Sequence, residues 1–255
     1  MDKQTEEILQ KIEEAEYVLV GLGQEFDMEF FLQSREDYRR IREQLQQQNV
    51  LWLLPYVEEQ FRRQYLPEME AEIEKGLQKL AKVLEKKSYF VVSSSLNHKL
   101  AEVPWKKMLL KKERFVAPCG DWTKKQCPDG CEEGIQTVTE ADEEQLQESF
   151  KKLQTNGFSV PDLGKCPKCG KKLVLNNVYA GRYDEKGYLK TWTEYPNWLL
   201  NTLYHKMVLL EIGEGNRFPT IIRSPFERIA LFQQKADLYC IDGEQNPIAW
   251  LLSLC

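Results

Sequence analysis

The chain has 255 residues, which is enough to bury a full hydrophobic core as one large domain or as a domain with an insertion. Apolar residues make up 42% of the sequence and charged residues 29%, a balance typical of a globular protein and not of a disordered one. The formal net charge of −5 argues against a general nucleic-acid binder, so we expect no nucleic-acid partner. One local basic patch, which we interpret as a solvated surface, consists of Lys106, Lys107, Lys111 and Lys112.

The sequence contains no apolar run that approaches the ~20 residues of a membrane-spanning helix. Its first 16 residues are acidic and amphipathic, which is typical neither of a signal peptide nor of a transit peptide. We therefore expect a cytoplasmic protein with no membrane partner. In a reducing compartment, the seven cysteines are interpreted as metal ligands before they are interpreted as disulfides.

The expected elements begin with an amphipathic helix near residues 3–16 and a short buried strand, "YVLVGLG", that ends in a glycine turn. Residues 24–48 and 56–87 have apolar positions three and four apart, which predicts long helices broken near Pro55 and Pro67. Four further runs predict strands: "YFVVSSS", "RFVAPC", "MVLLEIG" and "DLYCID". This order predicts an α/β fold, with a mainly parallel sheet of Rossmann type, helices on both faces and a helical layer.

The residues that follow the predicted strands indicate where a ligand would bind. Because the carboxyl ends of parallel strands meet at one edge of a sheet, we expect one crevice there, lined by Gly21, Ser95, Cys119, Gly213 and Asp242. The "GLG" stretch alone is weak evidence for a nucleotide site, because it is not a complete G-x-G-x-x-G fingerprint.

Two cysteine pairs predict a metal site. Cys127 and Cys131 lie in "CPDGC", and Cys166 and Cys169 lie in "CPKCG". Two such turns can place four thiolates tetrahedrally around Zn²⁺, and a site filled by four protein ligands has a structural role. The alternatives are reduced cysteines without a metal and a redox-active CxxC pair. Cys119 is left outside this set.

The order of these parts resembles the sirtuins, most closely the macrodomain-linked bacterial sirtuins. The resemblance covers residues 17–242 and includes the stretches "CGDW" and "LEIGEGNRFPTIIRSPF". It implies a Rossmann-like domain over residues 1–120 and 171–255, with the helical layer at about 24–88, and an inserted zinc-binding module over 121–170. It also implies a transferase that uses NAD and a protein substrate or partner.

The resemblance also implies the site residues. The cofactor-binding positions are Gly21, Gly23, Ser95, Asn97, Gly213, Gly215, Asn216 and Asp242, and the catalytic positions are Cys119, Asn97 and Asp121. Two positions depart from the family, since Leu22 stands in place of Ala and Glu25 in place of Ser. A larger side chain and an added negative charge both oppose the approach of a pyrophosphate.

Cys119 occupies the position at which most sirtuins carry a general-base His. A thiol with an ordinary pKa near 8.5 is a poor base at neutral pH, so we expect ADP-ribosyl transfer more than deacylation. The alternative interpretation of Cys119 is a small apolar filler. The neighbouring His98 is interpreted as a polar turn residue more than as a base.

Two other functions remain open from the sequence. One is a catalytically inactive sirtuin-like module that binds a nucleotide, ADP-ribose or a protein partner. The other is a thiol-redox protein that uses Cys119.

Overall fold

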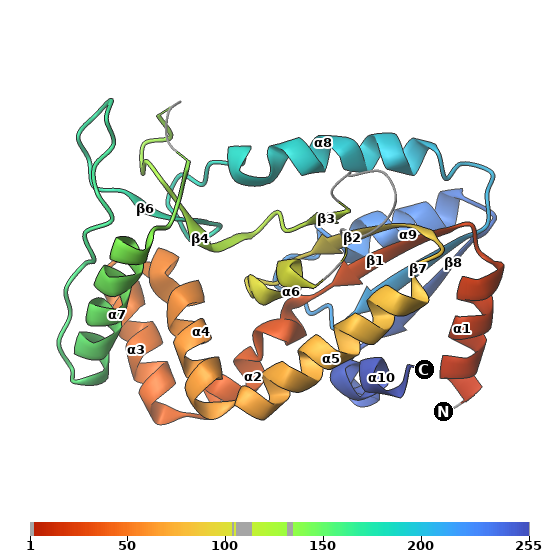
Figure 1. The fold of residues 1–255 in the computed structure, drawn as a ribbon, viewed down its shortest axis with the longest axis horizontal. Helices are drawn as coiled ribbons and strands as arrows, with labels where there is room; N and C mark the ends of the chain where they lie inside the picture. The colour runs from red at the N-terminus through yellow and green to blue at the C-terminus, as the bar shows by residue number, and fades with distance from the viewer. Residues whose placement is uncertain (1–2, 104, 106–113, 132–134, 255) are drawn as a thin grey trace.

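The structure is a computed structural model that describes residues 3–103, 105, 114–131 and 135–254. The basic patch predicted at residues 106–112 lies outside the described residues. Figure 1 shows two lobes, one built around a five-stranded sheet and the other around helices and a small sheet. Within the described ranges, no helix combines the length and the apolar character needed to cross a lipid bilayer.

The five-stranded sheet is parallel throughout, and its strand order is β3-β2-β1-β7-β8. The strands are β1 (Tyr17–Leu22), β2 (Ser88–Ser93), β3 (Phe115–Val116), β7 (Met207–Ile212) and β8 (Ala236–Ile241). All five predicted strands are therefore confirmed. The chain adds β2 and β3 on one side of β1 and later adds β7 and β8 on the other, so the order reverses at β1. A reversal of this kind leaves a crevice at the carboxyl ends of the central strands.

Helices cover both faces of this sheet (Figure 1). One face packs against α1 (Lys3–Glu14), α5 (Pro67–Val83) and α10 (Pro247–Ser253), and the other against α8 (Lys186–Leu200) and α9 (Arg223–Phe232). Successive residues of β1 alternate between the two cores, with Val18 and Val20 in one and Leu19 in the other. The strand is apolar at consecutive positions because both of its faces are buried.

The second lobe lies beyond the carboxyl edge of the five-stranded sheet (Figure 1). It contains α2 (Glu29–Gln33), α3 (Glu36–Gln47), α4 (Leu54–Tyr65), α7 (Glu140–Gln154) and an antiparallel sheet of β5 (Gln136–Thr137), β4 (Gly120–Gln126) and β6 (Val174–Asn177). One hydrophobic core joins the helices to the cysteine-bearing segment. The domain boundaries given above stay a prediction, although the helical layer shares its core with this segment.

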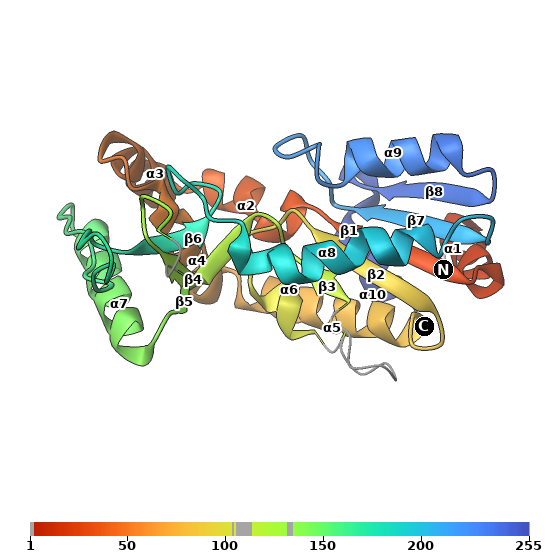
Figure 2. The ribbon, with the colours of Figure 1, turned by 90° about the horizontal axis from the view of Figure 1, so that it is seen from above.

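Short elements complete the chain. They are η1 (Gln24–Asp27), η2 (Leu51–Leu53), α6 (Lys99–Glu102) and η3 (Gly243–Gln245). Figure 2 shows α8 running along the molecule from the second lobe to the five-stranded sheet. The predicted helix breaks near Pro55 and Pro67 are confirmed, since α4 and α5 begin there and each proline stands in the first turn of its helix. Proline is favoured there because the first turn needs no amide hydrogen bond.

Candidate functional site

The four predicted metal ligands come together in the second lobe. The sulfur atoms of Cys127, Cys131, Cys166 and Cys169 all lie within 4.8 Å of one another. The Sγ atoms of Cys127 and Cys169 are 3.5 Å apart. Zinc bound tetrahedrally at about 2.3 Å from each sulfur requires sulfur separations of this size. The donor set therefore fits a structural zinc ion.

Two glycine turns shape this cluster. Gly130 and Gly170 have φ angles of +66° and +72°, a left-handed conformation that favours glycine. The Gly130 amide donates to the Cys127 carbonyl at 3.0 Å, and the Gly170 amide donates to the Cys166 carbonyl at 2.8 Å. The local sequence therefore folds each pair back so that both sulfurs face the same point.

The carboxyl edge of the five-stranded sheet is the second candidate site. The residues that follow β1, β2, β3 and β7 lie close together there. Ser94 Oγ, beyond β2, donates to the Glu214 carboxylate, beyond β7, at 2.7 Å. The buried Cys119 thiol lies close enough for Asp27, Arg217 and Glu214 to influence its pKa. Fully or largely buried ionisable groups are therefore concentrated at this edge.

The predicted glycines at this edge contact protein atoms. A side chain at Gly21 would collide with Ile222 of the segment before α9. One at Gly23 would collide with the backbone of Gly213 and Glu214, and one at Gly215 with the side chain of Gln24. In this structure these glycines allow close packing of the chain on itself.

Asp27 organises the end of β2. Its carboxylate accepts hydrogen bonds from Ser95 Oγ and from the Leu96 amide, the latter at 2.8 Å, and the residue is fully buried. Asn97 Nδ2 donates to the Phe26 carbonyl at 3.3 Å. Ser95 and Asn97 therefore hold the turn after β1 against the end of β2.

Arg217 supplies the positive charge of this cluster. Its guanidinium pairs with Asp27 and, at 3.1 Å, with Glu29, and it donates to Tyr179 Oη at 3.3 Å. Its side chain is only 16% exposed. We did not single out Asp27 or Arg217 from the sequence, because a single charged residue in a turn gives no signal of burial.

Two glutamates in this region have raised pKa values. Burial raises the pKa of Glu214 to about 7, against the effect of the Ser94 hydrogen bond. Burial and the nearby Asp27 raise the pKa of Glu58, on α4, to about 7. One oxygen of Glu58 accepts from Tyr38 Oη at 2.7 Å, while the other, Oε2, has no hydrogen-bond partner among the described residues. Perturbed, buried groups in one region are typical of functional sites.

A buried ion-pair network continues from this cluster into the helices. Arg62 of α4 is fully buried and pairs with Glu59 at 3.0 Å and with Glu70 of α5 at 3.1 Å. Lys99 pairs with the same Glu70 at 2.9 Å. Removal of one partner from such a network leaves an uncompensated buried charge. The network therefore ties α4, α5 and α6 together next to the candidate site.

Two predicted catalytic residues, Cys119 and Asp121, and the neighbouring His98 lie in different surroundings from Asn97. Cys119 is fully buried, and burial raises the pKa of its thiol far above the ordinary value. Asp121 Oδ1 accepts from the amide and hydroxyl of Thr123 at the start of β4. Burial lowers the pKa of His98, whose Nδ1 accepts a hydrogen bond from Trp122 Nε1 at 3.1 Å. His98 thus lies in the contact between the lobes, and a buried thiol with a raised pKa is a poor base.

The remaining predicted positions face Arg223. Asn216 Oδ1 accepts from Arg223 Nη1 at 3.1 Å, and Asp242 pairs with Arg223 Nη2 at 3.2 Å. The two residues that depart from the sirtuin pattern lie in different surroundings. Leu22 is buried in the core. Glu25 is exposed, and its Oε1 accepts a hydrogen bond from the Gly243 amide at 3.4 Å. Leu22 therefore does not face the crevice.

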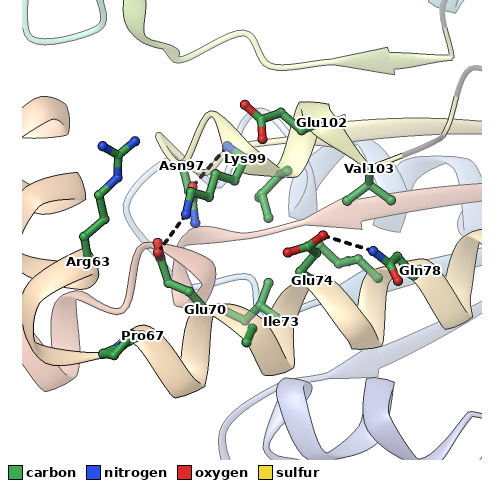
Figure 3. Close-up of a pocket in the computed structure, with 13 residues that line it drawn as sticks. Arg63, Pro67, Glu70, Ile73, Glu74, Gln78, Asn97, Lys99, Glu102 and Val103 are labelled. Atoms are coloured by element: carbon green, nitrogen blue, oxygen red, sulfur yellow. Dashed lines mark hydrogen bonds and ion pairs between the residues drawn. The ribbon is translucent and has the colours of Figure 1, made fainter. Parts of the chain in front are cut away.

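A cavity of about 470 Å³ lies between α5 and α6 (Figure 3). Asn97 and Lys99 lie at one end, where Lys99 pairs with Glu70, and Glu74 and Gln78 line the α5 side. Its charged end is thus part of the ion-pair network. None of the strand-end glycines lines this cavity.

The packing around the glycines at the strand ends determines whether a dinucleotide can approach them. Gly23 lies against the backbone of Gly213 and Glu214, and Gln24 fills the space beside Gly215. The Gln24 carboxamide also accepts a hydrogen bond from the Arg217 amide at 3.0 Å. In this arrangement Gly23 and Gly213 are therefore buried against protein atoms, which leaves their backbone closed to a pyrophosphate.

A scan of the sequence against protein-family models gave no match, and a search of curated proteins gave none either. Solved structures, in contrast, match over nearly the whole chain. A Sir2–p53 peptide–NAD+ complex matches with a TM-score of 0.52 and 13% identity, covering 99% of this chain and 96% of that one. Two Sir2 homologue mutants in complex with ADP-ribose match with TM-scores of 0.51 and 0.52 and 11% identity, each covering 99% of this chain and 94% of that one. The architecture that the sequence resemblance implied is thereby confirmed, and this chain has the fold of the Sir2 homologues.

Proposed function

We propose that the carboxyl edge of the five-stranded sheet is the site of an NAD-dependent reaction that modifies a protein. The observation that carries the proposal is the concentration there of buried ionisable groups, namely Asp27, Glu58, Glu214 and Arg217. Burial of such groups is unfavourable for folding, so their grouping at a ligand-binding edge favours a functional role. The solved structures that share this fold include complexes with NAD+ and with ADP-ribose, which supports NAD as the ligand.

Transfer of ADP-ribose to a protein acceptor is the favoured reaction. Cys119 stands where most sirtuins have the general base, and its pKa is raised by burial. Deacylation through this residue is therefore disfavoured. The raised pKa also disfavours the thiol-redox function, because the thiolate is the reactive species.

The second candidate is a sirtuin-fold module that binds ADP-ribose or a protein partner without turnover. The covered surfaces of Gly23 and Gly213 favour the protein-binding form of this candidate, because ADP-ribose contains the same pyrophosphate as NAD. In either case, Asp27, Ser95 and Asn97 are the positioning groups that the fold brings to the site.

One experiment separates these functions. The zinc-loaded protein is incubated with NAD labelled on its adenosine half and with an acetylated peptide, and three products are followed. Nicotinamide release together with label transfer to protein supports ADP-ribosyl transfer, while loss of the acetyl group supports deacylation. ADP-ribose binding by calorimetry without nicotinamide release supports the non-catalytic module.

A matched pair of variants links the products to the site. Asn97→Ala removes a predicted site side chain that takes no part in the Arg217–Asp27 ion pair, and it should lower nicotinamide release about tenfold if Asn97 contributes as much as one strong hydrogen bond. Asn201→Ala makes the same chemical change at an exposed position after α8 and should have no effect. Equal rates in both variants would contradict the assignment of the site.

A further inference from the structure

The segment 213–217 is bonded to the strand ends that it covers. The Glu25 amide donates to the Gly213 carbonyl at 3.0 Å, and the Gly23 amide donates to the Ile212 carbonyl at 2.8 Å. Ser94 Oγ holds the Glu214 carboxylate, and Gln24 Oε1 accepts from the Arg217 amide. Bonds from the ends of both β1 and β2 therefore keep this segment in the crevice.

Arg217, the last residue of the segment 213–217, anchors it through an ion pair with Asp27. Among the described residues, it is the cation that pairs with the buried Asp27 carboxylate. Glu29 has two cationic partners, Arg42 and Arg217. Asp27 therefore depends on Arg217 for charge compensation, whereas Glu29 does not.

Unpartnered atoms mark where the contact is incomplete. Arg217 Nε, Arg62 Nη1 and Glu58 Oε2 are buried without hydrogen-bond partners in the described part of the chain. Glu58 lies close enough to Asp27, Arg62 and Arg217 to sense all three charges. Buried polar groups without hydrogen-bond partners are unfavourable, so these atoms lower the stability of the closed state.

We propose that residues 213–217 form an autoinhibitory latch, in which the Arg217–Asp27 ion pair holds the segment over the glycine surfaces of Gly23 and Gly213. Movement of Arg217 away from Asp27 uncovers these surfaces. An anionic ligand such as a pyrophosphate competes for Arg217 and favours the open state. That last step rests on the proposed function, whereas the latch itself rests on the contacts of the chain.

The accessibility of the Cys119 thiol can be used to detect the open state without any ligand. The Cys119 side chain is fully buried and lies close enough to sense the charges of Asp27, Arg217 and Glu214, which all belong to the closed arrangement. Release of the segment should therefore expose its thiol to a maleimide reagent. Modification of individual cysteines is followed by mass spectrometry of the zinc-loaded protein, so that the metal-binding cysteines serve as internal references.

Two variants weaken the latch in different ways. Arg217→Met removes the cation, and the double variant Asp27→Asn with Arg217→Met removes both charges and so avoids an uncompensated carboxylate. Arg228→Met, at an exposed arginine of α9, is the control. Loss of a contact that favours closure tenfold should raise the rate of Cys119 labelling about tenfold.

The expected result is faster labelling of Cys119 in both latch variants, with Cys127, Cys131, Cys166 and Cys169 still protected. Unchanged Cys119 labelling in both variants would overturn the proposal. The proposal would also be overturned if Cys119 were labelled only at the same rate as the metal-binding cysteines, because that pattern indicates global unfolding. Faster Cys119 labelling without any binding of ADP-ribose would support the latch and contradict the proposed function.

Discussion

Cys119 is separated from the metal-binding cysteines both in sequence and in space. Its thiol is buried beside the polar cluster at the strand ends, whereas the four-cysteine cluster is complete without it. Structural zinc sites have four protein ligands, so no position is left for a fifth.

The first prediction is that Cys119→Ala retains zinc. The small change in volume should lower the free energy of unfolding by only about 1 kcal/mol. Metal content is measured after dialysis, and circular dichroism verifies the fold. Loss of zinc from a folded variant would show that Cys119 belongs to the metal site.

The second prediction concerns Glu214, whose pKa is raised by burial from 4.5 to about 7. Its contribution to stability is fully present below pH 4.5 and is lost as the pH rises through 7, because the folded state holds the proton more tightly than the unfolded state does. The loss amounts to about 3 kcal/mol, at about 1.4 kcal/mol per pKa unit. Glu214→Gln keeps a partner for Ser94 and should be more stable than the unmodified protein at pH 8 but not at pH 4.5.

Thermal denaturation from pH 4.5 to 8 tests this prediction, with Glu227→Gln at an exposed position of α9 as the control. Glu211, Arg223 and Arg217 are the charged groups that influence Glu214, and they remain in the variant. Because burial raises the pKa of Glu58 in the same way, part of the pH dependence should remain as well. Identical pH profiles for Glu214→Gln and the unmodified protein would show that Glu214 is solvated.

At the scale of elements, the cysteine turns are coupled to the core of the second lobe. Cys127 and Cys166 are buried in the same hydrophobic core as α3, α4 and α7. Lys125 of β4 pairs with Asp142 of α7 at 2.7 Å, which fixes that helix against the small sheet. Binding of zinc therefore contributes to the folding of a lobe much larger than the two turns.

The third prediction is that Cys166→Ser loses zinc and destabilises the second lobe. The measurements are metal content and thermal denaturation, with Cys240→Ser at an exposed position of β8 as the control. The control should retain both zinc and stability. Full zinc content in Cys166→Ser would rule out the proposed ligand set.

At the scale of the whole molecule, the crevice between the lobes is closed by contacts of its own residues. A protein that binds a ligand only in an open state has an apparent affinity reduced by the fraction of open molecules. If about one molecule in a hundred is open, the apparent affinity for a dinucleotide falls about a hundredfold.

The fourth prediction is therefore weak or absent binding of NAD to the unmodified chain, measured by calorimetry. Glu25→Ser should change this little, because Glu25 is exposed and contacts Gly243 outside the closed segment. Arg217→Met should open the crevice without producing tight binding, because it also removes the cation for which a pyrophosphate competes. Tight binding by the unmodified chain would contradict the closed arrangement.

The sequence by itself determined the strands, their parallel arrangement and the metal ligands, because these depend on local signals. Continuous apolar runs mark strands buried on both faces, and the turns in "CPDGC" and "CPKCG" place their own cysteines. Only the tertiary structure decided that the crevice is closed and that Leu22 lies in the core. The Arg217–Asp27 pair joins residues 190 positions apart, and no local pattern specifies which distant charge will neutralise a buried carboxylate.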